Sequence, residues 1–390
     1  MHAPFVPPAP SAAVARARRA IAAVFFINGA VMGSWAPLIP LVQLKLHLGP
    51  AQLGLCLLGM AVGGIAAMPL AGGLVNRFGS APVVRCSTLG LCGAILLPMA
   101  MPDARLLFLA LLVVGGVNGV MDVAMNAHGI AVEQALGRPV MSSYHAMYSL
   151  GGFTGALGGA ALLRATGHPL AEAATVGLSF GAFGLVVLRF LLASTVDQGA
   201  PGHAAFVFPK GLAVILGLLC FLVMMAEGSM LDWTAVYLHR VLGADASLAA
   251  LGFSAFSVAM ATGRFAGDWL RQRFGAAALV SSSAVLAAGG LLLAVAVPAI
   301  PVAVLGFGFC GLGLSNAVPV LFSAGGNLPG QSAGSGVAAV ATLGYAGFLV
   351  GPPLIGFSAQ LVSLRFGLGL VALGCTVVAV FARRVVGRGG

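Results

Sequence analysis

The sequence predicts an all-α membrane protein with twelve transmembrane helices in two pseudo-symmetric six-helix bundles. Its 390 residues are 60% hydrophobic and only 7% charged, and the mean hydropathy is +1.06, a composition outside the range of soluble globular domains. Apolar stretches long enough to cross a hydrocarbon core recur along the whole length. Because backbone polar groups cannot stay unpaired in lipid, and the stretches are too continuous for barrel strands, we expect helices.

Twelve spans follow one another from the first cluster of arginines to the C-terminal end. The 57 glycines suit close contacts between membrane helices better than they suit flexible linkers. The expected spans cover residues 19–45, 51–75, 80–101, 104–133, 139–166, 171–195, 210–241, 246–270, 275–297, 300–326, 331–360 and 363–386.

The two halves of the chain share short motifs at a nearly constant spacing. Arg77-Phe78-Gly79 returns 196 residues later as Arg273-Phe274-Gly275, and Ser149-Leu150-Gly151 returns 193 residues later as Thr342-Leu343-Gly344. Parallel six-helix repeats are an architecture of transporters. The expected parts are a disordered tail over 1–18, a first bundle over 19–195, a cytoplasmic linker over 196–209 and a second bundle over 210–390.

The basic residues in the short loops indicate the orientation. On a twelve-span count, thirteen of the 19 Lys and Arg fall on one side, which should be cytoplasmic and should hold both termini. We therefore expect a multi-pass protein of the bacterial inner (plasma) membrane. Charges scattered over helix ends, rather than clustered on one face, argue against nucleic acid as a partner. The thirteen are Arg16, Arg18, Arg19, Arg77, Arg85, Arg138, Arg189, Lys210, Arg271, Arg273, Arg383, Arg384 and Arg388, against Lys45, Arg105, Arg164, Arg240 and Arg365.

The N-terminal segment and the cysteines carry no further signal. Residues 1–11 are proline-rich and lack a basic start, so we expect a disordered tail rather than a cleaved signal peptide. The six cysteines form no CxxC pair and mostly lie within apolar spans. We assign them no disulfide, metal or cofactor, and we expect a monomer.

Acidic residues are the main clue to function. Only nine occur in the chain, and at least three of them, Asp122, Glu227 and Asp268, fall inside expected spans. An acid within the membrane is costly and by default marks a substrate or proton path. Burial disfavours the charged form of a carboxyl, which favours loading and release of a proton. We expect proton coupling by Asp122 and Glu227; the alternative is that Asp122 is permanently paired. Asn316, which matches Asp122 in the second half, would contribute only neutral hydrogen bonds.

Polar side chains recur on the helix faces around Asp122. Asn118 and Asn126 lie four residues before and after it and share its face, while His145 and Tyr148 share a face of the next span. Alternatively, the asparagines only join helices and His145 only binds a backbone carbonyl. Trp233 would either stack on substrate or anchor the protein at the membrane interface. The expected substrate-binding set is Asn118, Asn126, His145, Tyr148, Asn316, Trp233, Asn28 and Tyr345.

A charge clasp is expected near the cytoplasmic end of span eight. Arg264 and Asp268 are four residues apart, which allows them to pair along one helix. Such a pair would hold one conformation closed. Arg77 lies in the corresponding loop of the first half, and we assign all three residues to gating.

Two related segments, Gly72–Gly79 and Gly263–Leu270, occur in corresponding places of the two halves. Through them the chain resembles the major facilitator superfamily over essentially its full length. The loop Gly72–Gly79 is similar to the family signature between spans two and three, although Asn76 stands where the usual aspartate is found. The second-half counterpart, Gly263–Leu270, keeps its acid as Asp268. The resemblance implies the major facilitator fold, with a clasp weakened in the first half.

Spans four and five resemble the fucose-permease-like branch of this superfamily. The resemblance rests on Gly119–Asn126 and on Tyr144–Gly152. It implies that an acid in span four and polar residues in span five contribute to sugar binding and proton coupling. The matching residues here are Asp122, His145 and Tyr148.

These features predict a secondary active transporter that moves a small polar solute by alternating access, through proton symport. A sugar is one candidate solute. A proton-driven exporter of drugs or metabolites is the alternative, since it would use the same fold and acid, and the chain has 14 methionines. A receptor or scaffold would have no reason to keep Asp122 and Glu227 in lipid. An enzyme is disfavoured, because Ser142, Ser143 and His145 lack a nucleophile elbow and no metal-ligand spacing occurs.

Overall fold

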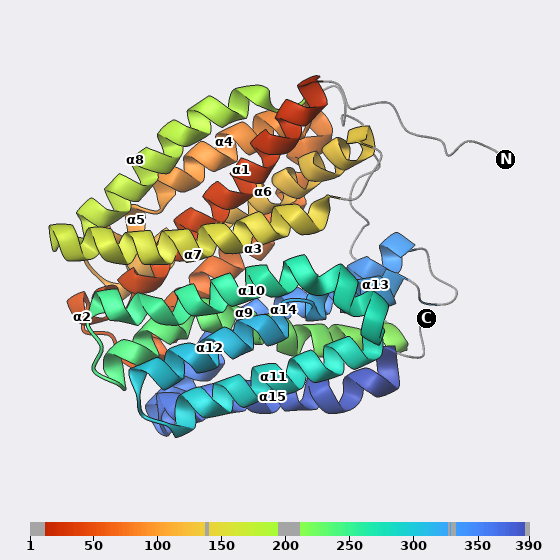
Figure 1. Ribbon diagram of the computed structural model, residues 1–390. Helices are drawn as coiled ribbons and strands as arrows, with labels where there is room; N and C mark the ends of the chain where they lie inside the picture. The colour runs from red at the N-terminus through yellow and green to blue at the C-terminus, as the bar shows by residue number, and fades with distance from the viewer. Residues whose placement is uncertain (1–11, 137–139, 194–210, 327, 329–332, 387–390) are drawn as a thin grey trace.

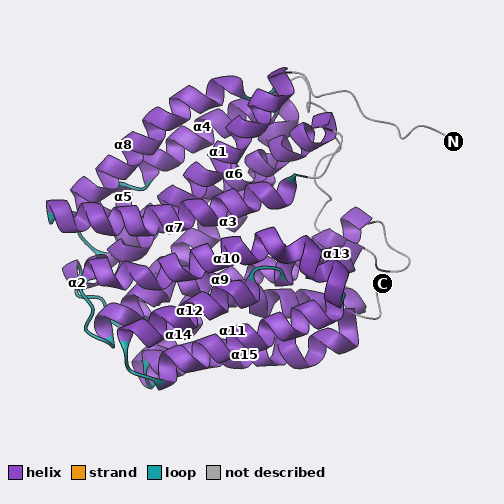
Figure 2. Cartoon of the chain, in the orientation of Figure 1, coloured by secondary structure: helices purple, strands orange, loops and turns teal. Residues whose placement is uncertain are grey.

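The computed structural model describes residues 12–136, 140–193, 211–326, 328 and 333–386, and within them it contains helices, turns and no strand (Figure 2). Residues 1–11 of the tail expected over 1–18, and the linker expected over 196–209, lie outside the described residues, whereas residues 12–18 belong to a helix. Twelve of the described segments are long and apolar enough to cross a membrane. The expected all-α membrane fold is confirmed.

The first half of the chain forms one bundle, the upper half of Figure 1. The first span starts at Ala12, earlier than expected, because Ala12–Arg19 consists mostly of alanine and arginine, which favour helix. The elements of this bundle are α1 (Ala12–Trp35), η1 (Ala36–Leu38), α2 (Ile39–Lys45), α3 (Pro50–Phe78), α4 (Ser80–Ala94), α5 (Leu97–Ala100), α6 (Ala104–Leu136), α7 (Met141–Thr166), α8 (Pro169–Val187) and η2 (Leu188–Phe190).

The second half forms the lower bundle in Figure 1. Its fourth span is divided at Ser315 and Asn316, whereas the corresponding helix of the first bundle, α6, is continuous. The elements are α9 (Leu212–Arg240), α10 (Ala246–Phe274), α11 (Ala276–Ala296), α12 (Ile300–Leu314), α13 (Ala317–Gly326), α14 (Ala333–Leu361) and α15 (Leu364–Val385).

The repeated Arg-Phe-Gly motif forms the same turn in both bundles. Gly79, between α3 and α4, has φ 78° and ψ 163°, and Gly275, between α10 and α11, has φ 79° and ψ 159°. A positive φ favours glycine, which has no Cβ to clash. Each glycine N–H donates to the carbonyl four residues earlier, at 2.7 Å to Val75 and 2.9 Å to Arg271. The sequence repeat thus corresponds to a repeated structural unit.

Glycines bring neighbouring helices within each bundle into backbone contact. A methyl group added to Gly29 or Gly33 of α1 would collide with the α7 backbone at Tyr148 or Gly152. Membrane helices gain no hydrophobic driving force from each other, so such close van der Waals contact is what holds them together.

The two bundles contact each other along α7 with α10 and along α3 with α14. At the end opposite to both termini, which we call the far end (turns at 46–49, 167–168, 241–245 and 362–363), η1 and α2 also reach α9. There Arg240 Nε donates to Gln43 Oε1 at 3.3 Å, and the Ala51 N–H donates to Gln360 Oε1 at 3.3 Å. The bundles are therefore joined at the far end.

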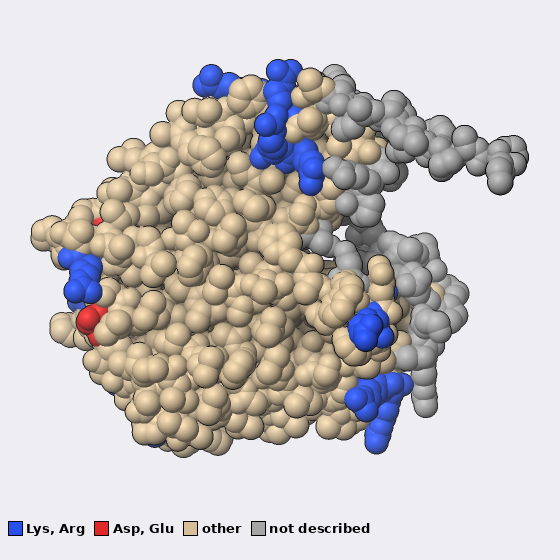
Figure 3. Space-filling view, viewed as in Figure 1, with Lys and Arg blue, Asp and Glu red and all other residues tan. Residues whose placement is uncertain are grey.

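Charged side chains gather at the two ends of the molecule. In Figure 3, Lys and Arg lie at the top and at the right of the visible face, Asp and Glu lie with further basic residues at the left, and an uncharged surface separates these groups. This is the distribution expected of a membrane-spanning protein, because a charge in the hydrocarbon core is costly.

The closed far end depends on two glycines at which α3 and α14 touch. A Cβ at Gly54 would lie 2.6 Å from the Pro352 carbonyl oxygen, and one at Gly356 would lie 2.7 Å from that of Pro50. Leucine at Gly356 should therefore force the bundles apart at this end. We expect spin labels at Leu44 and Leu248, in a Cys86→Ser background, to report a longer distance in Gly356→Leu.

The matched control is Gly289→Leu, because a side chain there meets open space. It should leave the label distance unchanged. If Gly356→Leu also left it unchanged, the α3–α14 contact would not control closure of this end.

Candidate functional site

A row of polar side chains lies in the middle of α6. Asn118, Asp122 and Asn126 are all half-buried, and steps of four residues advance by only about 40° around a helix, so they share one face. The Asn126 amide donates to the Asp122 carbonyl at 2.8 Å and to its carboxylate Oδ1 at 3.2 Å. No described residue forms an ion pair with Asp122. The Asp122 carboxylate therefore has a hydrogen-bond donor but no cation that compensates its charge.

Asn118 joins this row to α1. The Asn28 amide donates to Asn118 Oδ1 at 2.9 Å, and Asn28 is buried. An amide pair of this kind holds two membrane helices together. Asn28 and Asn118 thus fix α1 against α6, and Asn28 is not accessible to a solute in this conformation.

An ion pair faces α7 from the second bundle. Arg264 of α10 and Glu227 of α9 lie 3.2 Å apart, and their side chains are 13% and 21% exposed. The other guanidinium nitrogen of Arg264 donates to the Ser149 hydroxyl of α7 at 2.7 Å. Arg264 therefore links the two bundles through one side chain, while it compensates the charge of Glu227.

Two tyrosines are within electrostatic reach of both Asp122 and Glu227. Tyr148 is near enough to Glu227, Asp122 and Arg264 for their charges to act on its hydroxyl. The charges of Asp122 and Glu227 also act on the hydroxyl of Tyr345 on α14. Both tyrosines are half-buried. The fold thus brings Asp122 and Glu227, 105 positions apart in the chain, to one interface between the bundles.

His145 lies beside the site rather than at its centre. Its ring packs edge-on against Phe25, with ring centroids 5.3 Å apart. The Arg264 charge acts on the imidazole, and the His145 carbonyl accepts a long bond of 3.5 Å from the Arg264 guanidinium. The histidine is half-buried and follows the same helix face as Ser149.

Two of the expected binding residues, Asn316 and Trp233, are buried in the second bundle. The Asn316 amide donates to the Gly263 carbonyl and to the Ser315 hydroxyl, both at 2.9 Å, and its side chain fills the space beside Gly267 of α10. Trp233 is fully buried. Neither side chain is accessible to a solute in this conformation, and Trp233 does not face lipid as an interfacial anchor would.

Of the expected gating residues, the structure describes the side chains of Arg264 and Arg77. Arg264 has Glu227 and Ser149 as partners, because α9 and α7 lie beside it. The side chains of Asp268, Asn76 and Ser142 lie outside the described residues. Arg77 is exposed, with its guanidinium 5.1 Å from the centre of the Phe78 ring.

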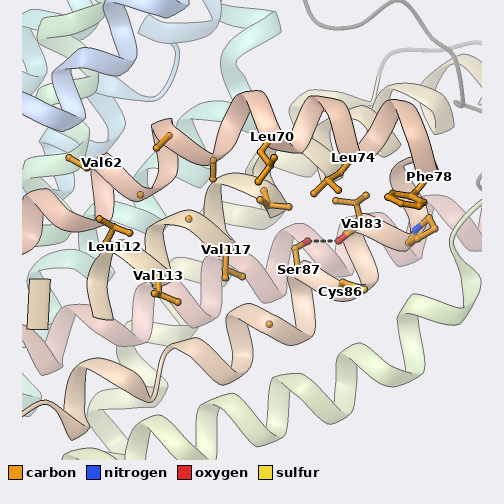
Figure 4. Close-up of a pocket in the computed structure, with 17 residues that line it drawn as sticks. Val62, Leu70, Leu74, Phe78, Val83, Cys86, Ser87, Leu112, Val113 and Val117 are labelled. Carbon is orange, nitrogen blue, oxygen red and sulfur yellow. Dashed lines mark hydrogen bonds between the residues drawn. The ribbon is translucent and has the colours of Figure 1, made fainter. Parts of the chain in front are cut away.

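A pocket between α3, α4 and α6 lies away from this site. It has a volume of about 790 Å³, and its lining is apolar apart from residues such as Ser87 and Cys86 (Figure 4). Val113, Val117 and Val120 line it from the face of α6 opposite to Asp122. The Ser87 hydroxyl is already bonded to the Val83 carbonyl at 2.7 Å. The pocket therefore offers little polar recognition.

Sequence reasoning missed the contact of Ser149. That residue entered the analysis only as part of a repeated motif, although its spacing of four from His145 places both on one helix face. Gln43, Arg240 and Gln360, which join the far end, carry no sequence signal that separates them from ordinary residues at span ends.

Comparisons with known proteins agree with this architecture. A model of the Major Facilitator Superfamily matches residues 21–352. An uncharacterized MFS-type transporter of Yersinia pestis is 40% identical over 367 residues, covering 93% of this chain and 94% of the relative.

Two solved structures show the same fold at low identity. The nucleoside transporter NupG, in a mutant form, superposes with a TM-score of 0.75 at 13% identity, over 94% of this chain and 99% of that chain. The Escherichia coli fucose:proton symporter FucP, also a mutant, gives 0.61 at 19% identity, over 94% and 98%. Proteins of this family are transporters and not enzymes. The chain belongs to the Major Facilitator Superfamily and is a multi-pass membrane transporter.

Proposed function

We propose that this transporter is a proton-coupled symporter of a small polar solute, with a sugar as one candidate. It would act as a monomer in the bacterial inner membrane, with both termini in the cytoplasm. The observation that carries the proposal is Asp122, a half-buried acid at mid-helix without an ion pair among the described residues. The charges of Asp122, Glu227 and Arg264 all act on Tyr148. The fucose:proton symporter, which has the same fold, is the precedent for the coupling ion and for the class of solute.

The proposed cycle uses the unequal partners of the two acids. Glu227 has a cation at 3.2 Å, whereas Asp122 has an amide donor, Asn126. A carboxylate without a cation in a membrane interior gains more from a proton than one that is ion-paired. Asp122 would therefore load the proton, and Glu227 would bind or release Arg264 as the bundles move.

The solute would bind between Asp122, Asn126 and Tyr148 on one wall and Glu227 on the other. Transporters built from repeats bind near the membrane midplane, so that rocking exposes one site to each side in turn. A ligand can shift this equilibrium only through contacts that differ between the two states. Contacts from both bundles satisfy that requirement. The far end, which is closed here, would be the periplasmic side, so the site would be reached from the cytoplasm.

The orientation can be tested by cysteine labelling in a Cys86→Ser background. We expect cysteines at Arg77 and Arg271 to react with a membrane-impermeant maleimide from the cytoplasmic side and a cysteine at Asp245 to react from outside, since basic loops stay inside. All three positions are exposed. Labelling of Arg77 and Arg271 from opposite sides would contradict the twelve-span topology.

Asp122→Asn should abolish solute accumulation driven by a pH gradient in proteoliposomes. Exchange of labelled for unlabelled solute should persist, because exchange requires no net proton movement. The solute for this assay is identified first, by screening a panel of sugars for a ligand-induced shift in the melting temperature of the protein. Uphill transport that survives the substitution would remove Asp122 from the coupling mechanism, and outward movement of lipophilic cations would favour a proton-driven exporter.

The control is Asp245→Asn at the start of α10. There the N–H of Leu248 and the Ser247 hydroxyl bond to the Asp245 carboxylate and lower its pKa, so it is an exposed, charged N-cap. Asparagine is also a good N-cap residue. This variant removes an acid without disturbing α10 and should leave accumulation intact.

The two walls of the site can be tested separately. Asn126→Ala in the first bundle and Glu227→Gln in the second should each weaken solute binding about tenfold, since one hydrogen bond to a charged group contributes about 1.5–3 kcal/mol and about 1.4 kcal/mol corresponds to a factor of ten. Binding is measured by isothermal titration of the folded variants. An effect of first-bundle variants alone would refute a shared site.

A further inference from the structure

Glu172 is a buried acid that the proposed cycle does not use. It lies in the first turn of α8, and its side chain is 0% exposed. Both carboxyl oxygens lack a hydrogen-bond partner among the described residues. Asp122 and Glu227, by comparison, each accept at least one hydrogen bond.

The fold makes room for this carboxyl between three helices. One carboxyl oxygen fills the space beside Gly159 of α7 in which a side chain would otherwise lie, and the Cβ of Ser34 on α1 borders the same space. The Ser34 hydroxyl donates to the Val31 carbonyl of its own helix. The surroundings therefore accept the carboxyl sterically but provide no donor.

No described residue forms an ion pair with Glu172. Between Arg19 and Lys45, the segment that forms most of α1 and α2 has no ionisable residue, and the Lys45 amine is bonded to the Met99 and Met101 carbonyls. The other elements that pack against α8 are α4, α5, α7 and η2. Their described ionisable residues form no hydrogen bond with Glu172. Those residues are Arg85, Cys86 and Cys92 on α4, Tyr144, His145, Tyr148 and Arg164 on α7, His168 in the preceding turn and Arg189 on η2.

Electrostatics decides which form of Glu172 fits this space. Burying an ionised carboxylate without a partner costs several kcal/mol even after relaxation of the protein. A neutral carboxyl that lacks a hydrogen bond costs about 1–3 kcal/mol. The protonated form is therefore the one compatible with the packing of α1, α7 and α8.

Glu172 also lies at the end of the molecule that must open during transport. It is one turn from the far-end turn at residues 167–168. The two helices that enclose it, α1 and α7, touch through glycine contacts, and α7 packs against α10 of the other bundle. Separation of the bundles at the far end would bring water to this group of helices.

We propose that Glu172 is a second proton-binding site, protonated while the far end is closed and exchanging its proton when that end opens. This inference rests on the proposed proton coupling, but it concerns a different residue and a different part of the first bundle. The two sites would be Asp122 near the midplane and Glu172 near the far end.

The protonation state is measured by infrared spectroscopy of the purified full-length protein in lipid nanodiscs. At about pH 7, where a glutamate in water is ionised, we expect a carbonyl band of a neutral carboxyl that disappears in Glu172→Gln. The matched control is Glu133→Gln, because the Glu133 carboxylate accepts bonds from the backbone N–H groups of Val140 and Met141 at 2.6 and 2.9 Å. That variant should lose no such band.

The dependence of this protonation on conformation is tested with the far end held closed and with the far end held open. A bifunctional cross-linker between cysteines at Gln43 and Arg240, which contact each other, holds this end closed; Gly356→Leu holds it open. We expect the Glu172 band to persist in the cross-linked protein up to about pH 9 and to be lost over this range in Gly356→Leu, since access to water allows the carboxyl to ionise. If Glu172→Gln does not fold, Gly159→Ala, which crowds the carboxyl oxygen, should shift the band.

Two results would overturn the inference. Absence of a band attributable to Glu172 would mean that the residue is ionised, and a band with the same pH response in both locked forms would mean that its proton does not follow the transport cycle. Both results are independent of transport by Asp122→Asn. If that variant still accumulated solute while the Glu172 band followed the far end, the role proposed for Asp122 would fail and that of Glu172 would stand.

Discussion

The structure depends on how closely two helices can approach each other in a medium without water. Every backbone N–H and C=O in a hydrocarbon core must be paired within the segment, and the helices that result attract one another mainly through van der Waals contact. Gly29 and Gly33 let α1 touch the α7 backbone, and Gly63 and Gly115 do the same for α3 and α6. These contacts hold each set of helices as a unit, so motion concentrates at the interface between the bundles.

The Glu227–Arg264 ion pair lies beside that interface. A charge buried away from it would have to be compensated within one bundle, whereas a charge between bundles can change partners when they move. Arg264 illustrates the difference, because it bonds to Glu227 of its own bundle and to Ser149 of the other. Breaking a buried pair leaves an uncompensated charge at a cost of about 3–5 kcal/mol. Because Arg264 bonds to both residues, the free energy of the charged Glu227 carboxylate depends on the position of α7 relative to the second bundle.

Equivalent positions of the two halves have taken on different tasks. Asp122 lies on the continuous helix α6 and faces the interface. Its counterpart Asn316 lies at the break between α12 and α13, where its amide bonds to the Gly263 carbonyl of α10. An amide can satisfy a backbone group in lipid without any change of charge. The repeat thus preserves the turn chemistry of Gly79 and Gly275 while the acid remains in one half only.

Composition and spacing determined the helical membrane fold, the repeated turns at Gly79 and Gly275 and the shared helix face of Asp122 and Asn126, because each depends only on residues near in the chain. Which helices are neighbours, and how each is rotated, was decided by the tertiary structure. It set Glu227 beside Arg264, enclosed Trp233, and placed Glu172 against Gly159 without a partner. Helical periodicity tells which side chains share a face but not what that face meets, since in a membrane the surrounding lipid is as apolar as the helices themselves.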